Sequence, residues 1–406
     1  NPVSVMMNKA MIEFPERFSG SEAIGPLPAS DKQNKKRATV DILQDWGGTK
    51  GLAEDVRRYG YWLRDRVLDS VGDRYKKVEI TAEMASQRED LKPYVGESLT
   101  VIAWLWARTV KSPNPAFSSI HVPLVRSFIL SSKKGKEAWV DPVVSADGYS
   151  FIVKAGKIPN DAIGGTVVRT GGTCILSKAA MPFSYIREQG RLGEMKERLM
   201  AVVLQGRRER LYISPTDKIL SEISVQDISW RPENLLPNNP RDFKTPNYGL
   251  EKFGDLFSNR QLSLLNAFTD VLPALKERVL DDAVVSGMPL SEKSLDDGGV
   301  GAEAYSELIV FYFGLIMSKL TIFHNTLARW RGGEGKSAPA FGRQAIPMVW
   351  DYTEVNPFAG AGGDLLGVVD GAVRALGNFS TAARGHATQQ DAQSQKISVK
   401  KVVSTD

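Results

Sequence analysis

The feature that most constrains the fold of this 406-residue chain is a change in the spacing of its apolar residues. In 52–71 they recur every three or four positions, which predicts an amphipathic helix with charged residues facing water. In 99–214 they form short runs rich in Val, Ile, Trp and Tyr, bounded by Gly and Pro, which is typical of strands. Helical spacing returns in 260–280 and 302–330. The pattern therefore predicts a β-rich segment between helical regions.

Shorter segments complete this prediction. Six runs in the β-rich segment have the length and composition of strands, namely 101–110, 122–130, 138–144, 149–154, 199–204 and 210–214. A short helix is expected at 3–12, ahead of Pro15, and another helix that ends near Leu376. The stretch 287–301 is expected to be a surface loop, and 400–404 a closing strand.

Histidine and cysteine usage argues against several kinds of site. The three histidines, His121, His324 and His386, are far apart and lack the i, i+4 pairing of zinc hydrolases, so structural or solvent-facing roles are expected. Cys174 is the only cysteine, which excludes an internal disulfide and fits a reducing cytoplasm. A zinc site normally needs four ligands, so metal binding is not expected.

Other motifs are equally uninformative about an activity. The sequence contains neither a Gly-x-Gly-x-x-Gly nor a phosphate-binding Gly-x4-Gly-Lys-Ser/Thr motif, and the stretch 360–363 suits a turn that enters a helix. The longest apolar run, 308–317, is ten residues long, well short of the ~20 that cross a bilayer. No membrane-spanning helix is therefore expected.

Positive charge gathers at two turns of the β-rich segment. The whole chain has 52 basic and 47 acidic residues, and a net charge of +5 permits a polyanionic partner without establishing one. Two turns between predicted strands should form basic hairpin tips: Lys-Lys-Gly-Lys at 133–136, and the turn that holds Arg207, Arg208 and Arg210. Solvated surface is the ordinary role of such tips, and two of them on one β-rich segment also suit contacts with phosphates.

Six sequence blocks are spread in order over nearly the whole chain. They are 1–15, Trp106-Ala-Arg-Thr-Val110, Phe183-Ser-Tyr-Ile-Arg-Glu-Gln-Gly190, Asp255-Leu-Phe-Ser-Asn-Arg-Gln-Leu262, 341–358 and 402–406. Together they resemble successive blocks of the large bacterial and archaeal adenine-specific DNA methyltransferases that carry a zinc-ribbon insert. The resemblance implies an α/β fold in which a partial doubly wound methyltransferase sheet is made from the two ends of the chain. A β-rich degenerate zinc-ribbon insert and a helical region would interrupt that sheet.

The resemblance also implies site residues. In that family an acidic residue that holds the ribose of S-adenosylmethionine precedes an Asn-Pro pair, which places Asn1 beside the cofactor. Asp391 resembles the acidic residue that contacts the cofactor's adenine, and an exposed loop residue is its other interpretation. Asp406 resembles the first residue of Asp-Pro-Pro-Tyr, whose acceptors hold the N6 amino group of a flipped adenine. The cofactor loop and Pro-Pro-Tyr are expected outside 1–406, so this central portion should be inactive alone.

The zinc-ribbon segment departs from the family pattern. Where relatives have one cysteine pair, this chain has Ser112 and Phe117, and where they have the second pair it has Cys174 and Ser177. A serine hydroxyl is a poor zinc ligand and a phenyl ring is none. We therefore expect the β-structure to persist by packing without zinc, and Cys174 to be a small buried hydrophobe.

Four domains are expected: a partial methyltransferase core with the amphipathic helix in 1–98, the β-rich degenerate ribbon in 99–215, a helical region in 216–335, and a return to the core in 336–406. The function implied is an S-adenosylmethionine-dependent adenine-N6 DNA methyltransferase of the prokaryotic cytoplasm, acting on double-stranded DNA, as in restriction-modification. The alternative is a non-catalytic DNA-binding or interaction module derived from such an enzyme.

Overall fold

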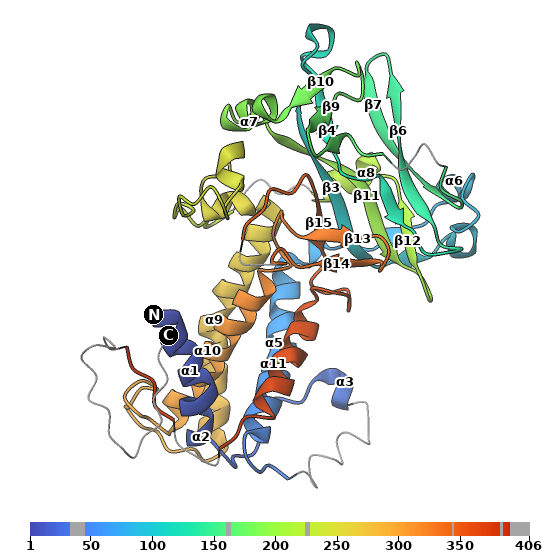
Figure 1. Cartoon of the computed structure of the whole chain (residues 1–406). Helices are drawn as coiled ribbons and strands as arrows, with labels where there is room; N and C mark the ends of the chain where they lie inside the picture. The colour runs from blue at the N-terminus through green and yellow to red at the C-terminus, as the bar shows by residue number, and fades with distance from the viewer. Residues whose placement is uncertain (33–44, 160–163, 224–227, 343–344, 382–384, 390–406) are drawn as a thin grey trace. The chain divides into compact units, whose positions relative to one another are not determined.

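The computed structural model describes residues 1–32, 45–159, 164–223, 228–342, 345–381 and 385–389 (Figure 1). The chain divides into two compact units. Unit 1 consists of residues 1–66, 268–319 and 368–406, and unit 2 consists of residues 67–267 and 320–367. Each unit is therefore assembled from segments that are far apart in the sequence.

Unit 1 is helical in its described part. Four long helices contribute most of it: α5 (Lys50–Val71), α9 (Asn259–Val285), α10 (Ala302–Leu320) and α11 (Leu365–Leu376). Shorter elements are α1 (Pro2–Asn8), a π-helical turn (Lys9–Glu13), α2 (Phe14–Arg17) and α3 (Ala29–Lys32). The helices predicted at 3–12, at 260–280 and up to Leu376 are thereby confirmed.

Helix α5 confirms the amphipathic helix predicted at 52–71. Val56, Tyr59 and Leu63, which lie on its apolar stripe, are fully buried. Gly60 lies on the same helix where α11 approaches it, and a Cβ atom at this position would be 2.8 Å from Cγ1 of Val369. The glycine therefore permits the close packing of α5 against α11.

Asp55 of α5 is a buried carboxylate with several donors around it. It accepts hydrogen bonds from the backbone N–H groups of Ile24 (2.9 Å) and Gly25 (2.7 Å), and from the hydroxyl of Tyr305 (2.5 Å). Burial raises the pKa of Asp55 to about 6, although these hydrogen bonds and the charge of Arg58 act in the opposite direction. The ionised form is therefore disfavoured in the folded protein relative to the unfolded chain.

This shift predicts a pH-dependent contribution to stability. Between the ordinary value of 3.8 and about pH 6 the folded state binds more protons than the unfolded state, so the unfolding free energy falls as the pH rises. The contribution of Asp55 to the unfolding free energy is complete below pH 3.8 and is lost by about pH 6. A pKa shift of two units corresponds to a contribution of about 3 kcal/mol. Denaturant unfolding of wild type and Asp55→Asn across this range should show a stability difference that declines with pH.

Asp65→Asn is the matched control, since Asp65 lies on the same helix with 57% of its side chain exposed. A decline with pH that is confined to Asp55→Asn would assign the effect to the buried carboxylate. A pH-independent difference for Asp55→Asn would show that Asp55 does not titrate in this window.

Unit 2 contains the described strands. Its largest sheet has the order β12 (Arg210–Ile213), β11 (Lys196–Gln205), β3 (Val101–Lys111), β15 (Asp351–Val355), and β4 (His121–Leu124) also pairs with β3. A second sheet consists of β5 (Ile129–Ser131), β6 (Ala138–Ser145) and β7 (Gly148–Ala155). All these pairings are antiparallel.

Smaller elements surround the two sheets. They are the sheet β10 (Ala180–Pro182), β9 (Gly171–Thr173), β8 (Val167–Val168), the hairpin β13 (Arg329–Arg331) and β14 (Lys336–Ala338), and the pair β1 (Val78–Glu79) and β2 (Ser98–Leu99). Unit 2 also has the helices α6 (Ala82–Ala85), α7 (Phe183–Arg191) and α8 (Asp217–Ile223).

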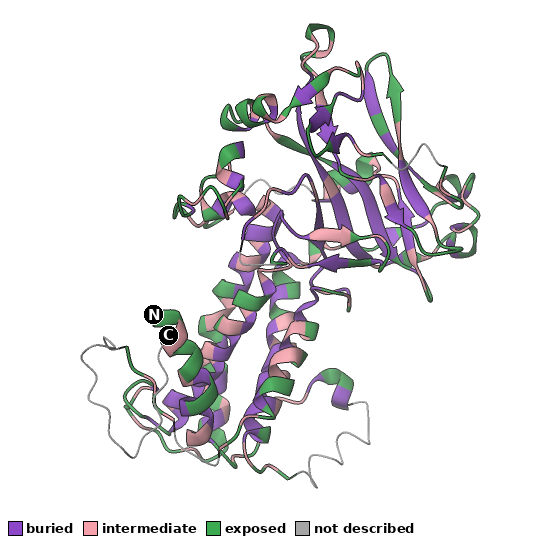
Figure 2. Cartoon of the chain, in the orientation of Figure 1, coloured by how far each residue is buried: buried purple, intermediate pink, exposed green. Residues whose placement is uncertain are grey.

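Strand β3 is the centre of unit 2. Nine of its eleven residues are buried, and Figure 2 shows the same burial along its neighbours in the sheet. Leu105 and Ala107 pack into one hydrophobic cluster and Trp104, on the other face, into a second. A strand covered on both faces needs apolar residues at nearly every position, which explains why 101–110 was predictable as one run.

Two predicted elements differ from the structure. The run 122–130 forms two strands, because the chain leaves the first sheet at Val125, whose N–H donates to Oγ1 of Thr166 (2.9 Å). The helix predicted at 302–330 ends at Leu320. Beyond it the Asn325 side chain donates to the carbonyl of Thr321 (2.7 Å) and accepts from the N–H of Leu327 (2.8 Å), and such local bonds compete with helical ones.

The glycine-rich stretch 360–363 is a turn that enters helix α11, as predicted. The carboxylate of Asp364 accepts hydrogen bonds from the N–H groups of Gly360 (2.7 Å) and Gly367 (3.1 Å), so it bridges the turn and the first helical residues. Gly363 has a φ of 91°, and a Cβ atom there would lie 2.8 Å from Val355. Only glycine fits this position without strain.

The fold contains both helices and strands, as expected of the broad α/β class. The described residues contain no parallel pair of strands, and the parallel contact between Phe243 and Ile346 is an isolated bridge. The doubly wound sheet is thus not found in the part of the chain that can be described. The closing strand predicted at 400–404 lies outside the described residues.

No described helix is long and apolar enough to cross a lipid bilayer.

Candidate nucleic-acid interface

The turn that holds Arg207, Arg208 and Arg210 is a hairpin tip, as predicted. Strands β11 and β12 pair up to Gln205 and Arg210, and the N–H of Gly206 closes the turn by donating to the carbonyl of Glu209 (3.0 Å). Arg207 and Arg208 are exposed, and Arg210 is half-buried. The hairpin therefore presents three guanidinium groups at one end of the largest sheet.

The second predicted basic turn lies against this tip. Lys133, Lys134 and Lys136 are exposed on the turn between β5 and β6. The ammonium of Lys136 donates to the carbonyl of Arg208 (3.2 Å) and forms an ion pair with Glu209 (3.5 Å). The structure thus brings together two basic turns that are about 70 residues apart in the sequence.

A third basic tip, which the sequence analysis missed, completes the surface. It is the turn between β13 and β14, flanked by Arg331 and Lys336, whose side chains are about half exposed. The ammonium of Lys133 donates to the carbonyl of Glu334 in this turn (2.8 Å). The sequence Arg-Trp-Arg-Gly-Gly-Glu-Gly-Lys, in which glycines separate two short runs, is typical of a hairpin. The hairpin was not predicted because this sequence follows directly on a strongly helical stretch.

We call these three turns the basic tip cluster. It has eight basic side chains, those of Lys133, Lys134, Lys136, Arg207, Arg208, Arg210, Arg331 and Lys336. Three carboxylates, those of Glu97, Glu209 and Glu334, form ion pairs with members of the cluster. The ammonium of Lys336 and the guanidinium of Arg331 hold the pKa of Glu334 below its usual range. The cluster therefore keeps an excess of positive charge at neutral pH, which suits a polyanion.

The remaining predicted site residues are not brought into this cluster. Asn1 lies in unit 1, where its side chain accepts a hydrogen bond from the N–H of Val3 (3.0 Å) and caps helix α1. Asp391 and Asp406 lie outside the described residues. The positions proposed for the cofactor and for catalysis therefore stay predictions.

Three of the four positions that the resemblance assigns to a degenerate zinc ribbon come together, namely Ser112, Cys174 and Ser177. Oγ of Ser112, just after β3, lies 3.3 Å from Sγ of Cys174, just after β9, although 62 residues separate them. Ser177 also hydrogen-bonds to the thiol. Residues 174–179 form a tight turn in which the N–H of Lys178 donates to the carbonyl of Cys174 (2.9 Å), and Lys178 has a φ of 59°. The β-structure expected around these positions is present.

Cys174 is fully buried, as predicted, but it is more polar than a simple hydrophobe. Burial by itself would raise the pKa of its thiol. Hydrogen bonds from the hydroxyls of Ser112 and Ser177 and from backbone N–H groups outweigh burial, so the pKa lies below its ordinary value. One thiol and two hydroxyls do not form a zinc donor set, and the described residues hold no group of three or more His, Cys, Asp or Glu that could bind a metal.

The histidines have structural partners. His324 is fully buried, and its Nε2 lies 2.8 Å from the carbonyl of Gly363. Nε2 of His121 lies 3.1 Å from the carbonyl of Glu194, and Nδ1 of His386 lies 3.2 Å from the carboxylate of Glu13. These contacts agree with the structural roles predicted for them.

No protein-family model, curated protein or solved structure matches this chain.

Restoring the missing thiols should create a zinc site if these segments descend from a zinc ribbon. Zn–S bonds of about 2.3 Å place tetrahedral ligands about 3.8 Å apart, close to the 3.3 Å between Ser112 and Cys174. We expect Ser112→Cys, Phe117→Cys and Ser177→Cys together to bind one zinc per chain, measured by elemental analysis, and a chelator to lower the melting temperature of this variant only.

The wild-type protein should carry no stoichiometric zinc in the same measurement. Adding Cys174→Ser to the triple variant is the matched control, because it removes one thiolate from the restored set and should weaken zinc binding. A triple variant that folds but binds no zinc would show that these segments are not a degenerate ribbon.

Proposed function

We propose that this chain is part of an S-adenosylmethionine-dependent adenine-N6 DNA methyltransferase, in which unit 2 binds double-stranded DNA. The six sequence blocks support the assignment to that class. The observation that carries the DNA-binding part is the basic tip cluster, in which three turns from distant segments present eight basic side chains on one surface. In this proposal the enzyme works in the prokaryotic cytoplasm, in restriction-modification or a related form of DNA methylation.

The cluster is suited to phosphates by its chemistry. Arginine guanidinium groups bind phosphate oxygens through paired N–H donors, and lysines contribute point charges. Contacts of this kind fix the position of a duplex without reading its sequence. Each turn joins two paired antiparallel strands, so backbone hydrogen bonds position the segments that carry these charges.

The catalytic step in this proposal belongs to Asp406. An acceptor at this position would hold the N6 amino group of an adenine that has left the stack, and so orient its lone pair toward the methyl donor. Asn1 and Asp391 are assigned to the cofactor on the resemblance alone. S-adenosylmethionine would supply the methyl group when bound.

A second candidate function is a non-catalytic DNA-binding module. The lost zinc ligands at Ser112, Phe117 and Ser177 favour it, because a domain that has lost one ancestral site can have lost another. The basic tip cluster serves both candidates. Only an activity measurement separates them.

The arginines of the first tip test the DNA interface. Replacing Arg207, Arg208 and Arg210 by Ala should weaken binding to a duplex about tenfold or more at moderate salt. It should also reduce the slope of the salt dependence by about 0.9 for each phosphate group that the protein no longer neutralises. Titration of a labelled duplex by fluorescence anisotropy at several salt concentrations measures both quantities.

The matched control replaces three exposed basic residues of unit 2 outside the cluster, Lys157, Arg169 and Arg191. This variant loses the same net charge, so it separates a local contact from a general electrostatic effect. Equal weakening by the two triple variants would argue against a specific interface at the hairpin tips.

The activity itself is tested with the chain joined to its natural flanking sequences. We expect transfer of a methyl group to adenine N6 in duplex DNA, and a loss of about a hundredfold or more in rate for Asp406→Ala, because misplacing a reacting group costs on this order. The affinity for DNA should change much less than the rate. A protein that binds DNA and never methylates adenine would favour the non-catalytic module.

A further inference from the structure

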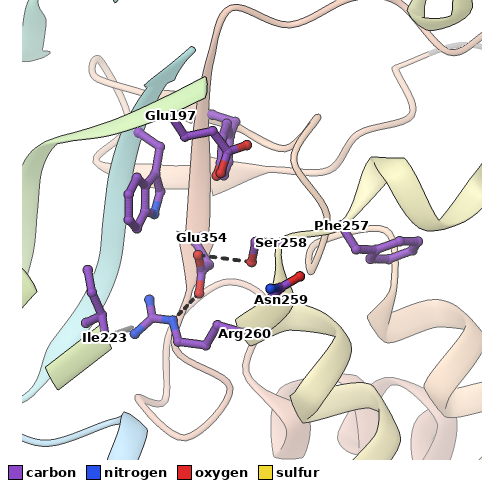
Figure 3. A pocket seen from close by; sticks show the side chains of 9 residues that line it. Glu197, Ile223, Phe257, Ser258, Asn259, Arg260 and Glu354 are labelled. Carbon is purple, nitrogen blue, oxygen red and sulfur yellow. Dashed lines mark hydrogen bonds and ion pairs between the residues drawn. The ribbon is translucent and has the colours of Figure 1, made fainter. Parts of the chain in front are cut away.

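Unit 2 has a pocket of about 390 Å³ on one face of its largest sheet (Figure 3). Trp106 of β3, Glu197 of β11, and Tyr352 and Glu354 of β15 line it, and Arg260 closes it from the start of α9. Trp106 and Tyr352 are direct cross-strand partners, and alternate residues of a strand share a face, so these side chains point the same way. The volume is within the range of small-molecule sites.

One wall of the pocket is aromatic. The rings of Trp106 and Tyr352 are nearly parallel, at 12°, with their centroids 6.4 Å apart. Trp106 is only half-buried, whereas Tyr352 is buried. Flat aromatic surfaces of this kind bind other planar rings by stacking.

Two buried N–H donors at the pocket lack partners. Nε of Arg260 forms an ion pair with Glu354, and its Nη1 donates to the carbonyl of Arg74 (3.2 Å), but its Nη2 has no partner. Nε1 of Trp106 is likewise buried without one. Buried donors in folded proteins are nearly always satisfied, so two at one pocket point to a ligand or water that accepts from them.

The charges at the pocket indicate which class of ligand it can bind. The carboxylate of Glu354 is buried beside Arg260, and that of Glu197, a third exposed, lies 3.5 Å from Arg108. Two carboxylates disfavour a phosphate, and each already has a cationic partner, which disfavours a metal ion. The pocket therefore suits an uncharged planar ring that accepts from the buried N–H groups and donates to Glu197.

We propose that this pocket holds one unstacked nucleobase that carries an exocyclic amino group, as adenine does. Its ring nitrogens accept hydrogen bonds, its amino group donates one, and its face stacks on an aromatic side chain. The inference rests on the DNA partner proposed above. It assigns unit 2 a contact with a base in addition to contacts with phosphates.

Strand β11 connects the pocket to the first tip of the basic tip cluster. Glu197 and Gln205, which precedes that tip, are eight positions apart, and at about 3.3 Å per residue these positions span roughly 26 Å. This distance corresponds to between about seven and eight base pairs at 3.4 Å each. A short duplex is therefore long enough to span the distance between the two places.

Two labelled duplexes test the proposal on the chain as it is: one fully paired, the other with a single unpaired adenine. Wild type should bind the second about tenfold or more tightly, because stacking on an aromatic residue favours an unstacked base. Trp106→Leu should lose this preference and keep its affinity for the paired duplex. Trp230→Leu is the matched control, since Trp230 is an exposed tryptophan of unit 2 outside the pocket, and it should keep the preference.

Glu197→Ala tests the amino group by removing its acceptor. Arg108, the ion-pair partner of Glu197, keeps its hydrogen bonds to the carbonyls of Val349 and Thr326. Wild type should prefer an unpaired adenine to an unpaired purine without the amino group, and Glu197→Ala should bind both equally. If wild type binds the paired and unpaired duplexes equally, or if the preference survives Trp106→Leu, the pocket does not hold a base. Either result leaves the proposed DNA partner in place. Failure to bind either duplex overturns the DNA partner as well, whereas methyl transfer by the extended protein bears only on the proposed activity.

Discussion

The antiparallel pairing of β3 with β15 is the contact on which the structure of unit 2 depends. It joins residues Ala103–Ala107 to residues Asp351–Val355, nearly 250 positions away, and so closes a very long loop. The entropy of closure grows only slowly with loop length, and the burial of β3 on both faces offsets it. The same pairing places Trp106 beside Tyr352. Without it, the pocket would lose Tyr352 and Glu354 from its lining.

The sequence was informative wherever one local pattern determines a structure. The apolar spacing of α5 and the continuous apolar run of β3 each reflect burial of their own side chains, so both were predicted from short windows. The tips at 133–136 and at Arg207 were predicted because a basic turn between two strands is a local feature. Strand β15 was not predicted because its partner β3 is distant in the sequence, and hairpin β13–β14 was not predicted because it follows a strongly helical stretch. The pocket could not be predicted for the same reason as β15, since five separate segments build it.

The cluster of Ser112, Cys174 and Ser177 shows how polar side chains can hold a turn in place. Two hydroxyls hydrogen-bond to one buried thiol. Such bonds are weak individually, but buried polar groups that satisfy each other hold the surrounding backbone in one arrangement. The left-handed conformation of Lys178 belongs to this arrangement, because the turn demands it although the residue is not glycine.

The basic side chains lie on turns or at the strand ends that flank them, and this position separates two kinds of evolutionary change. A substitution inside β3 or β11 alters a core that both faces of the sheet share, so it is constrained by packing. A substitution at the tip of a hairpin, or a change in the number of residues there, leaves that core intact. The spacing and strength of positive charge on this surface can therefore diverge between related proteins while the sheet beneath it stays the same.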